Sequence, residues 1–206
     1  MTVKVCGLKE ADNIAGVASL GVDMLGFIFY EKSPRYCKPA RISAVGSQTK
    51  VGVFVNASFD EITDRVSVCG LDAVQLHGDE SPDLCRRLAA RRLVVIKALP
   101  VSSACDLRKA EAYSASVDYI LFDTRCEGYG GSGRSFDHSI LLGYASPTPF
   151  LLSGGLRPES VDSIRDFMRI APPTFAGVDL NSGFETAPGL KNIAALQTFI
   201  ATLRNL

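Results

Sequence analysis

The hydrophobic positions of the chain gather into short, nearly unbroken apolar runs at fairly regular intervals. These runs are rich in Val, Ile and Phe and lack the strict apolar/polar alternation of a half-exposed strand, as is typical of parallel strands covered on both faces. The eight runs span residues 3–6, 24–30, 51–55, 73–76, 93–99, 119–122, 150–152 and 177–180. The pattern therefore predicts eight buried parallel strands.

Segments with helical spacing of apolar residues lie between several of these runs. Ser58 with Glu61 three residues later predicts a capping box, and Ser81 before Pro82 predicts a cap with proline at the first helical position. Helical stripes are formed by Ile14, Val17 and Ala18, by Ile62, Val66 and Cys69, by Leu84 and Leu88, by Val161, Ile164 and Met168, and by Ile193, Leu196, Phe199, Ile200 and Leu203.

Strands that alternate with helices imply right-handed crossovers and a parallel sheet. Eight repeats suit a closed (β/α)₈ TIM barrel better than an open doubly wound sheet, which usually has fewer strands. We expect each strand to be followed by a helix. With 206 residues the chain is short for such a barrel, so the loops should be short. Without a linker or composition shift, residues 1–206 are expected to form a single compact domain.

The charge balance limits the classes of partner. Lys plus Arg (22) equals Asp plus Glu (22), so no net field gathers nucleic acid or an anionic membrane, and an anionic ligand needs a local site. No apolar run is long enough to span a bilayer, and polar residues follow the first strand too soon for a signal peptide. We therefore expect a cytoplasmic protein without a nucleic-acid or membrane partner.

The six cysteines are scattered, and none forms a close C-x-x-C pair. Structural zinc sites and thioredoxin-like redox motifs both need such pairs, so neither is favoured. In a reducing compartment most of these thiols are expected to act as small buried hydrophobes. Cys37 and Cys126 fall in loops expected at the barrel mouth, where a role beyond packing stays open.

In a (β/α)₈ barrel, functional groups gather where the strands end and in the loops that follow. Polar residues end several of the apolar runs, which a purely structural loop does not require. The resulting candidates are Cys6, Tyr30 with the loop to Arg35, Asn56, Gln75, His77, Lys97, Asp123, residues 153–155 and residues 179–183.

Glycine-rich stretches follow the last two predicted strands: Gly154 and Gly155 after the seventh, and Asn181, Ser182 and Gly183 after the eighth. Glycines let backbone N–H groups approach an anion, and barrels commonly hold phosphate in these two loops. We interpret them as a phosphate site rather than as ordinary turns. A third glycine-rich stretch, residues 128–133, reads either as a flap over the mouth or as a flexible linker.

Cys6 and Asp123 each have a structural and a chemical interpretation. A lone Cys on a strand is commonly a buried hydrophobe, but Lys4 lies two residues back on the same face, and its ammonium should lower the pKa of the Cys6 thiol. Lys4 has a second potential partner in Asp179, because the first and last strands become neighbours when the barrel closes. Asp123 either caps the following segment or is a carboxyl kept protonated by apolar surroundings, able to donate a proton.

Arg35 and His77 are similarly ambiguous. The Arg35 fork suits a planar carboxylate, but a single Arg in a charged loop is often a solvated side chain. His77, one of two histidines, is otherwise a hydrogen-bonded core or rim residue.

Taken together, the motifs resemble the phosphoribosylanthranilate isomerase family of tryptophan biosynthesis over essentially the whole chain. They are KVCGL at 4–8, GFIFY at 26–30, SPRY at 33–36, VGVFVN at 51–56, VQLHG at 74–78, FDT at 122–124, GGSG at 130–133, LSGGL at 152–156 and VDLNSGFE at 178–185. The resemblance implies the Amadori rearrangement of N-(5′-phosphoribosyl)anthranilate to 1-(2-carboxyphenylamino)-1-deoxyribulose 5-phosphate without metal or cofactor, by a monomer or homodimer.

The resemblance also assigns roles to residues. Cys6 matches the family's general base, Asp123 its general acid, and Arg35 the arginine that engages the anthranilate carboxylate. His77 and Asp179 line the mouth as binding or orienting groups. The phosphate loops contain Gly154, Gly155, Asn181, Ser182 and Gly183, with Asn181 standing where many relatives have serine.

Three other functions are weighed against this one. The aminoaldose isomerase of histidine biosynthesis resembles it but has an aspartate at the position of Cys6 and a substrate with a second phosphate. A metal-dependent sugar-phosphate epimerase needs several strand-end histidines, and His77 alone does not meet that need. A catalytically silent scaffold is disfavoured because both Cys6 and Asp123 are present.

Overall fold

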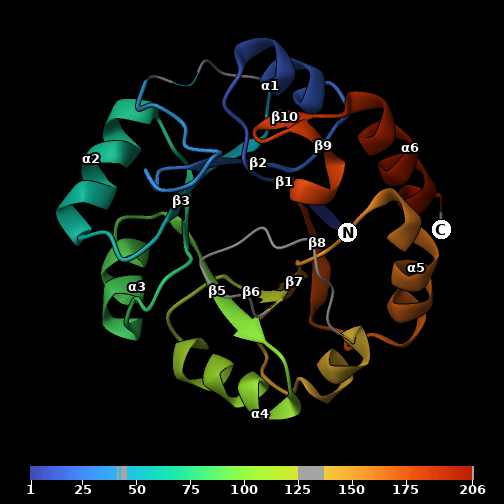
Figure 1. The fold of residues 1–206 in the computed structure, drawn as a ribbon. Coiled ribbons are helices and arrows are strands. Elements are labelled where there is room, and N and C mark those ends of the chain that lie inside the picture. Colours follow the sequence, from blue (N-terminus) through green and yellow to red (C-terminus); the bar gives the residue numbers. More distant parts are fainter. Residues whose placement is uncertain (41, 43–45, 125–136, 206) are drawn as a thin grey trace.

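The computed structural model describes residues 1–40, 42, 46–124 and 137–205. Eight parallel strands form a closed barrel in sequence order, as predicted, and Figure 1 shows it along its axis with the helices outside. The strands are β1 (Thr2–Val5), β2 (Met24–Ile28), β3 (Thr49–Phe54), β4 (Ala73–Leu76), β5 (Val94–Val101), β6 (Tyr119–Thr124), β7 (Phe150–Leu152) and β8 (Phe175–Leu180).

The barrel closes between its first and last strands, β1 and β8. Lys4 is the register partner of Asp179, and on its other side it pairs with Met24 of β2. Gly177 of β8 lies so close to the backbone at Thr2 that a Cβ atom there would collide with the Thr2 carbonyl oxygen. The closing seam therefore needs glycine at position 177 for the strands to approach.

Helices cover the outside of the barrel and confirm the predicted stripes. Ser58 and Glu61 form the expected capping box, and the Ser81 side chain accepts from the Leu84 backbone N–H. The α-helices are α1 (Ala11–Ala18), α2 (Phe59–Cys69), α3 (Pro82–Ala89), α4 (Ala104–Leu107), α5 (Val161–Ile170) and α6 (Ile193–Arg204). The 3₁₀ helices are η1 (Arg108–Tyr113), η2 (His138–Gly143), η3 (Pro158–Ser160) and η4 (Ser182–Phe184).

The expectation that each strand is followed by a helix is wrong after β2. In the described part of residues 29–48 no helix forms, and the chain instead returns to β2 through an isolated parallel bridge between Ile28 and Tyr36. Pro34 and Pro39 lack the backbone N–H that a helix needs and restrict the residues before them. After β6, the first helix among the described residues is the 3₁₀ helix η2.

Two apolar layers hold the strands in place. Outward-facing strand residues such as Val5 and Phe122 pack against the helices in one large cluster. Inward-facing residues form a second, smaller cluster that fills the barrel interior. Its buried members are Met24, Val51, Ala73, Ile96, Ala98, Leu121 and Leu151. Because strand side chains alternate, the next inward positions along the strands carry the polar residues of the barrel mouth.

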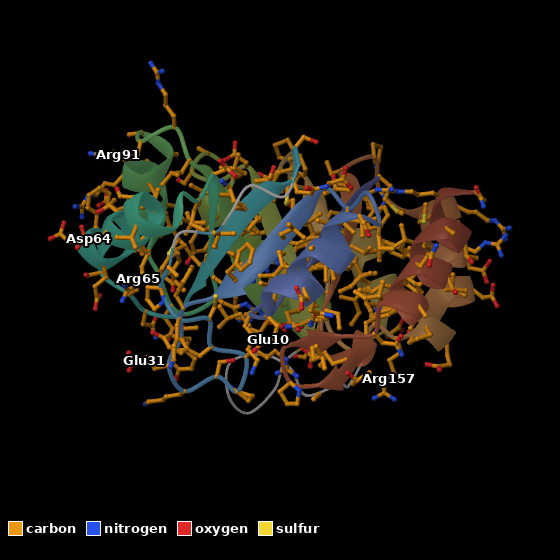
Figure 2. All side chains as sticks on the ribbon, turned by 90° about the horizontal axis from the view of Figure 1, so that it is seen from above. Glu10, Glu31, Asp64, Arg65, Arg91 and Arg157 are labelled. Carbon is orange, nitrogen blue, oxygen red and sulfur yellow. The ribbon has the colours of Figure 1, made fainter. Side chains whose placement is uncertain are left out.

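The loops after the strands lie at one end of the molecule. In Figure 2, Glu10, Glu31 and Arg157, which follow β1, β2 and β7, lie in the lower half of the view, while Arg91, which precedes β5, lies at the upper left. A two-stranded antiparallel hairpin, β9 (Glu185–Ala187) and β10 (Leu190–Lys191), is added at the mouth after η4. Among the described residues no helix is long and apolar enough to cross a membrane.

Candidate active site

Cys6 follows directly after β1 and is buried with an exposed fraction of 3%. Its backbone N–H donates to the Leu180 carbonyl oxygen at 2.9 Å, which continues the β1–β8 ladder to the rim. Gly26 on the neighbouring strand makes room for the sulfur, since a Cβ atom there would lie 2.8 Å from the Cys6 Sγ. The thiol therefore sits in a fitted place at the barrel mouth.

Burial raises the pKa of the Cys6 thiol, and Asp179 adds to this shift. The ammonium groups of Lys4 and Lys191 act in the opposite direction but do not outweigh burial. The contribution expected from Lys4 is thus found, while the expectation of a net lowered pKa for the Cys6 thiol is wrong, because burial outweighs the ammonium.

The sequence offers two partners for Lys4, the Cys6 thiol and the Asp179 carboxylate, and Lys4 interacts with both. Its Nζ donates to Asp179 Oδ1 at 2.9 Å, and neither side chain is more than 5% exposed. Burial alone would lower the pKa of Lys4, but Asp179 and Cys6 together raise it, which keeps the ammonium charged. Lys4 therefore links the Cys6 thiol to Asp179.

Asp123 faces His77 at the mouth of the barrel. The His77 Nε2 lies 3.4 Å from Asp123 Oδ2, and the two side chains are 19% and 14% exposed. The other ring nitrogen, Nδ1, lies 2.8 Å from Gln75 Nε2. With the amide donating to Nδ1, a neutral His77 carries its proton on Nε2, facing the carboxyl of Asp123.

Asp179 joins the two halves of the site. It interacts electrostatically with Lys4, with Asp123 and with His77, and it also acts on Cys6. These groups stand on or directly after β1, β4, β6 and β8, so the barrel brings them to the same end of the strands. Cys6 and Asp123 each interact electrostatically with Asp179.

Arg35 lies at the rim beside Cys6 and is not a solvated side chain. Its guanidinium donates hydrogen bonds to Glu185 at the start of β9, with Nε 2.9 Å from both carboxylate oxygens and Nη2 2.8 Å from Oε2. The side chains are 13% and 5% exposed. A Cβ atom on Gly7 would lie 2.9 Å from Arg35 Cδ, so the arginine stem runs across the backbone that follows the thiol.

The two predicted phosphate loops touch each other. Gly154 and Gly155 have φ of 87° and 67°, values that favour glycine, and Gly183 packs so tightly that a Cβ atom would collide with the Leu156 carbonyl oxygen. Across the described residues, the backbone N–H groups of Gly154 and Gly155 donate to no protein acceptor. The arrangement offers unpaired donors at the mouth, beside the Gly183 loop.

Asn181 and Ser182 lead from β8 into η4. The Asn181 side-chain oxygen accepts from Lys191 Nζ at 2.8 Å and packs against Gly7. Its side chain is therefore directed toward the Arg35 side of the mouth, and a phosphate contact from Asn181 would have to come from its backbone.

Lys97 was expected among the polar groups at the mouth, and this expectation is wrong because its side chain faces outward. It shares a face with outward-facing Val95 and Leu99, and its Nζ contacts the Leu76 and Gly78 carbonyl oxygens and, at 2.9 Å, Glu80 Oε2. The pair is almost completely buried, at 1% exposure each. Lys97 therefore fastens the loop that follows β4 and carries His77.

Sequence reasoning missed Glu80, Glu185 and Lys191, although Glu185 lay inside a quoted motif. In the sequence these three residues look like ordinary surface charges, because some of their partners lie far away along the chain. Arg35 and Glu185, for example, are 150 positions apart. Cys37 is buried in the outer core, in agreement with a packing role. Cys126 and residues 128–133 lie outside the described residues. In the part of the chain described, no group of three or more His, Cys, Asp or Glu side chains could hold a metal ion.

Comparison with known proteins identifies the family. A family model described as N-(5′phosphoribosyl)anthranilate (PRA) isomerase matches residues 3–202. An N-(5′-phosphoribosyl)anthranilate isomerase from Parabacteroides distasonis is 52% identical over 206 residues, covering 97% of this chain and 92% of the relative. The crystal structure of phosphoribosyl anthranilate isomerase from Thermotoga maritima matches with a TM-score of 0.88 at 40% identity over 100% of both chains.

A second solved structure bears on the ligand. It is a phosphoribosyl anthranilate isomerase in complex with reduced 1-(o-carboxyphenylamino)-1-deoxyribulose 5-phosphate, with a TM-score of 0.83, 36% identity and 100% coverage of both chains. These matches confirm the resemblance read from the motifs and extend over the whole barrel. The chain belongs to the N-(5′-phosphoribosyl)anthranilate isomerase family.

Proposed function

We propose that this chain catalyses the Amadori rearrangement of N-(5′-phosphoribosyl)anthranilate to 1-(2-carboxyphenylamino)-1-deoxyribulose 5-phosphate in tryptophan biosynthesis, by general acid–base catalysis without metal or cofactor. The observation that carries the proposal is the convergence of a thiol, Cys6, and a carboxyl, Asp123, on one residue, Asp179, at the mouth of a barrel with a donor-rich glycine site.

The substrate has an anionic group at each end, and the site offers a donor set for each. The phosphate fits the backbone N–H groups of Gly154 and Gly155, with Ser182 and Gly183 beside them. The anthranilate carboxylate fits the Arg35 guanidinium, whose stem runs beside Gly7. The aminoribose then spans the mouth between thiol and carboxyl, with His77 and Asp179 orienting these two groups.

The first step opens the sugar ring. As the C1′–O4′ bond breaks, Asp123 gives its proton to the leaving oxygen O4′, and the anthranilate nitrogen supplies its lone pair to C1′. The result is an open-chain iminium ion. His77, held by Gln75 with its Nε2 proton facing Asp123, fixes the orientation of the carboxyl during this transfer.

The second step removes the C2′ proton, which the adjacent iminium makes acidic. Cys6 as thiolate accepts this proton, the C2′–H electrons form the C1′=C2′ bond, and the nitrogen regains its lone pair. The enolamine then tautomerises: C1′ gains a proton and the C2′ hydroxyl becomes the ketone. Burial disfavours the thiolate, whereas Lys4, Lys191 and the cationic iminium favour it, so Cys6 becomes a base chiefly with substrate in place.

The proposal is tested by following N-(5′-phosphoribosyl)anthranilate, formed from anthranilate and phosphoribosyl pyrophosphate, through its fluorescence. The purified chain should consume it and yield the ketose product, which after reduction with borodeuteride carries the deuterium at C2′ rather than at C1′ in fragment mass spectra. Full activity should persist in excess EDTA. A chain that leaves this substrate untouched but turns over the bisphosphorylated aminoaldose of histidine biosynthesis would contradict the proposal.

Three expectations from the sequence accompany the proposal as predictions: a single domain over residues 1–206, a cytoplasmic location, and a monomer or homodimer. A related solved structure contains monomers generated from the dimeric isomerase of Thermotoga maritima, which supports both oligomeric states for the fold. Size-exclusion chromatography with light scattering would assign the state of this chain.

A further inference from the structure

Three charged side chains from distant parts of the sequence meet at the mouth of the barrel. Arg35 comes from the loop after β2, Glu185 opens β9, and Lys191 ends β10. Glu185 stands between the two cations, with Oε2 2.8 Å from Arg35 Nη2 and Oε1 2.7 Å from Lys191 Nζ. The added hairpin thus brings one carboxylate and one ammonium to the arginine proposed to bind substrate.

Glu185 is saturated with donors. Its Oε1 accepts from Lys191, from Arg35 Nε at 2.9 Å and from the Gly189 backbone N–H at 3.0 Å, while Oε2 accepts from Arg35 alone. Burial alone would raise the pKa of the Glu185 carboxyl, but the bonds from Arg35 and Lys191 outweigh it and lower that pKa. The carboxylate is therefore ionised and immobile, and it holds Arg35 in one orientation.

Lys191 is fixed as firmly. Its side chain is fully buried, and besides Glu185 it donates to Asn181 Oδ1 at 2.8 Å. The Asn13 side chain of α1 clamps the Lys191 backbone, donating to its carbonyl oxygen at 2.9 Å and accepting from its N–H at 2.8 Å. Because Lys191 balances Glu185, the cluster of Arg35, Glu185 and Lys191 keeps one positive charge.

The geometry leaves a single edge of the guanidinium for a ligand. Glu185 occupies the side edge, formed by Nε and Nη2. The terminal edge consists of Nη1 and the second N–H of Nη2, and within the described residues Nη1 has no protein acceptor. A planar carboxylate is the ligand that accepts two parallel N–H groups of such an edge.

We propose that Glu185, backed by Lys191, is a positioning and specificity-determining residue: it holds Arg35 so that only its terminal edge meets the substrate, which selects an aryl amine bearing a carboxylate. This inference rests on the proposed function, since it assigns the aryl carboxylate to Arg35. A ligand without that carboxylate leaves the fixed cation unpaired in a partly buried place, and sites built around a hydrogen-bonding group reject analogues that lack it.

The test compares two ligands by calorimetry. One is reduced 1-(o-carboxyphenylamino)-1-deoxyribulose 5-phosphate, and the other is the same compound with a plain phenyl ring. We expect the wild-type chain to prefer the first about 10- to 100-fold, as a charge-assisted hydrogen-bonded pair implies. Glu185→Gln should lose most of this preference while its affinity for the phenyl compound stays the same, because a single amide oxygen cannot serve both Lys191 and Arg35.

A cycle of variants shows whether Glu185 acts through Arg35. The double variant Arg35→Met with Glu185→Gln should lose no more preference than Arg35→Met alone, since both changes remove the same interaction. Glu31→Gln is the matched control, an exposed residue in the same loop as Arg35, and it should keep the wild-type preference. If Glu185→Gln does not fold, Arg35→Lys tests the same point, because an ammonium keeps the charge but has no second edge.

The outcomes separate the two proposals. A wild-type preference for the carboxylate ligand that Glu185→Gln or Arg35→Lys retains overturns the positioning role alone. An equal loss of affinity for both ligands in Glu185→Gln also overturns it, because a general structural role acts on both. A wild-type chain that neither binds the carboxylate ligand nor turns over N-(5′-phosphoribosyl)anthranilate overturns the proposed function and this inference with it.

Discussion

Lys4 and Asp179 form a buried ion pair across the seam where the barrel closes, with 2.9 Å between Nζ and Oδ1. They are register partners on β1 and β8, so the same pairing that closes the sheet brings the two charges together. The pair also faces the Cys6 thiol, two residues along from Lys4. One contact thereby links closure of the fold to the electrostatics of the proposed base.

Replacing Lys4 should make Cys6 harder to ionise. Lys4→Met removes the ammonium that favours the Cys6 thiolate, and this loss raises the pKa of Cys6. Because an opposite charge at close range shifts a pKa by about one to three units, the pH profile of Cys6 alkylation should move upward by that amount. Mass spectrometry of the iodoacetamide-labelled peptide measures it.

Cys105 supplies the internal control for this experiment. It is an exposed thiol on α4, and its labelling in the same sample should follow the same pH profile in both proteins. An unchanged pH profile of Cys6 labelling in Lys4→Met would mean that Lys4 does not influence the ionisation of the Cys6 thiol.

The proton-abstracting role of Cys6 predicts a loss confined to turnover. Cys6→Ser should lower kcat by about 10²- to 10⁴-fold, the usual contribution of a general base, and leave KM nearly unchanged because the group acts in the transition state. Cys105→Ser is the matched control and should keep wild-type kcat. Steady-state kinetics of Cys6→Ser with near-normal kcat would mean that another residue is the base.

In the wild type, alkylation of Cys6 should speed up with pH into alkaline solution. Burial holds the pKa of the Cys6 thiol above its ordinary value, so the thiolate fraction grows about tenfold per pH unit below that pKa. The logarithm of the rate of Cys6 labelling by iodoacetamide should therefore climb with a slope of about one across neutral pH and level off only in alkaline solution. A labelling rate that is already constant around neutral pH would contradict the raised pKa of this thiol.

Arg35 should govern binding more than chemistry. Arg35→Met removes the guanidinium that is proposed to hold the aryl carboxylate, which should raise KM about 10- to 100-fold by the loss of a charge-assisted pair. The effect on kcat should be much smaller, because this interaction is made before the transition state as well as in it. A KM equal to that of the wild type would show that the carboxylate binds elsewhere.

Breaking the Lys97–Glu80 ion pair should lower the stability of the fold, because both side chains are buried and the remaining charge would lack a partner. Lys97→Met leaves the Glu80 carboxylate buried without its cation and should lower the free energy of unfolding by about 3 to 5 kcal/mol. The exposed pair of Arg86 and Asp83 is the comparison, and Arg86→Met should cost at most about 1 kcal/mol. Urea denaturation measures both, and equal small effects would show that the buried pair is already solvated.

The barrel was predictable because its signals are local. Apolar runs, the Ser58 capping box and the stripe of α6 depend on neighbours a few residues apart, and each is found where it was expected. The helix wrongly expected after β2 came from extending the repeat over a segment that contains Pro34 and Pro39. The strand–helix repeat describes the fold as a whole, and prolines within one segment can prevent the expected helix there.

The site was only partly predictable because its partnerships are not local. Cys6, Asp123 and Arg35 stand in recognisable motifs, but nothing near Arg35 indicates that Glu185 holds it. The net pKa of Cys6 was misjudged for the same reason: Lys4 is visible two residues away, whereas burial depends on the folded barrel. The expectation of Lys97 at the mouth was wrong, although side-chain alternation argues against it, since Lys97 shares a face with Val95 and Leu99, which pack outward.

The most direct test of the account is a crystal structure with reduced 1-(o-carboxyphenylamino)-1-deoxyribulose 5-phosphate bound. It should place the phosphate on the Gly155 and Gly183 loops, the carboxylate on the terminal edge of Arg35, and C2 of the sugar within about 3.5 Å of the Cys6 sulfur. The Asp123 carboxyl should lie across the sugar from that sulfur. An analogue bound in the reverse direction, or with C2 out of reach of the sulfur, would contradict it.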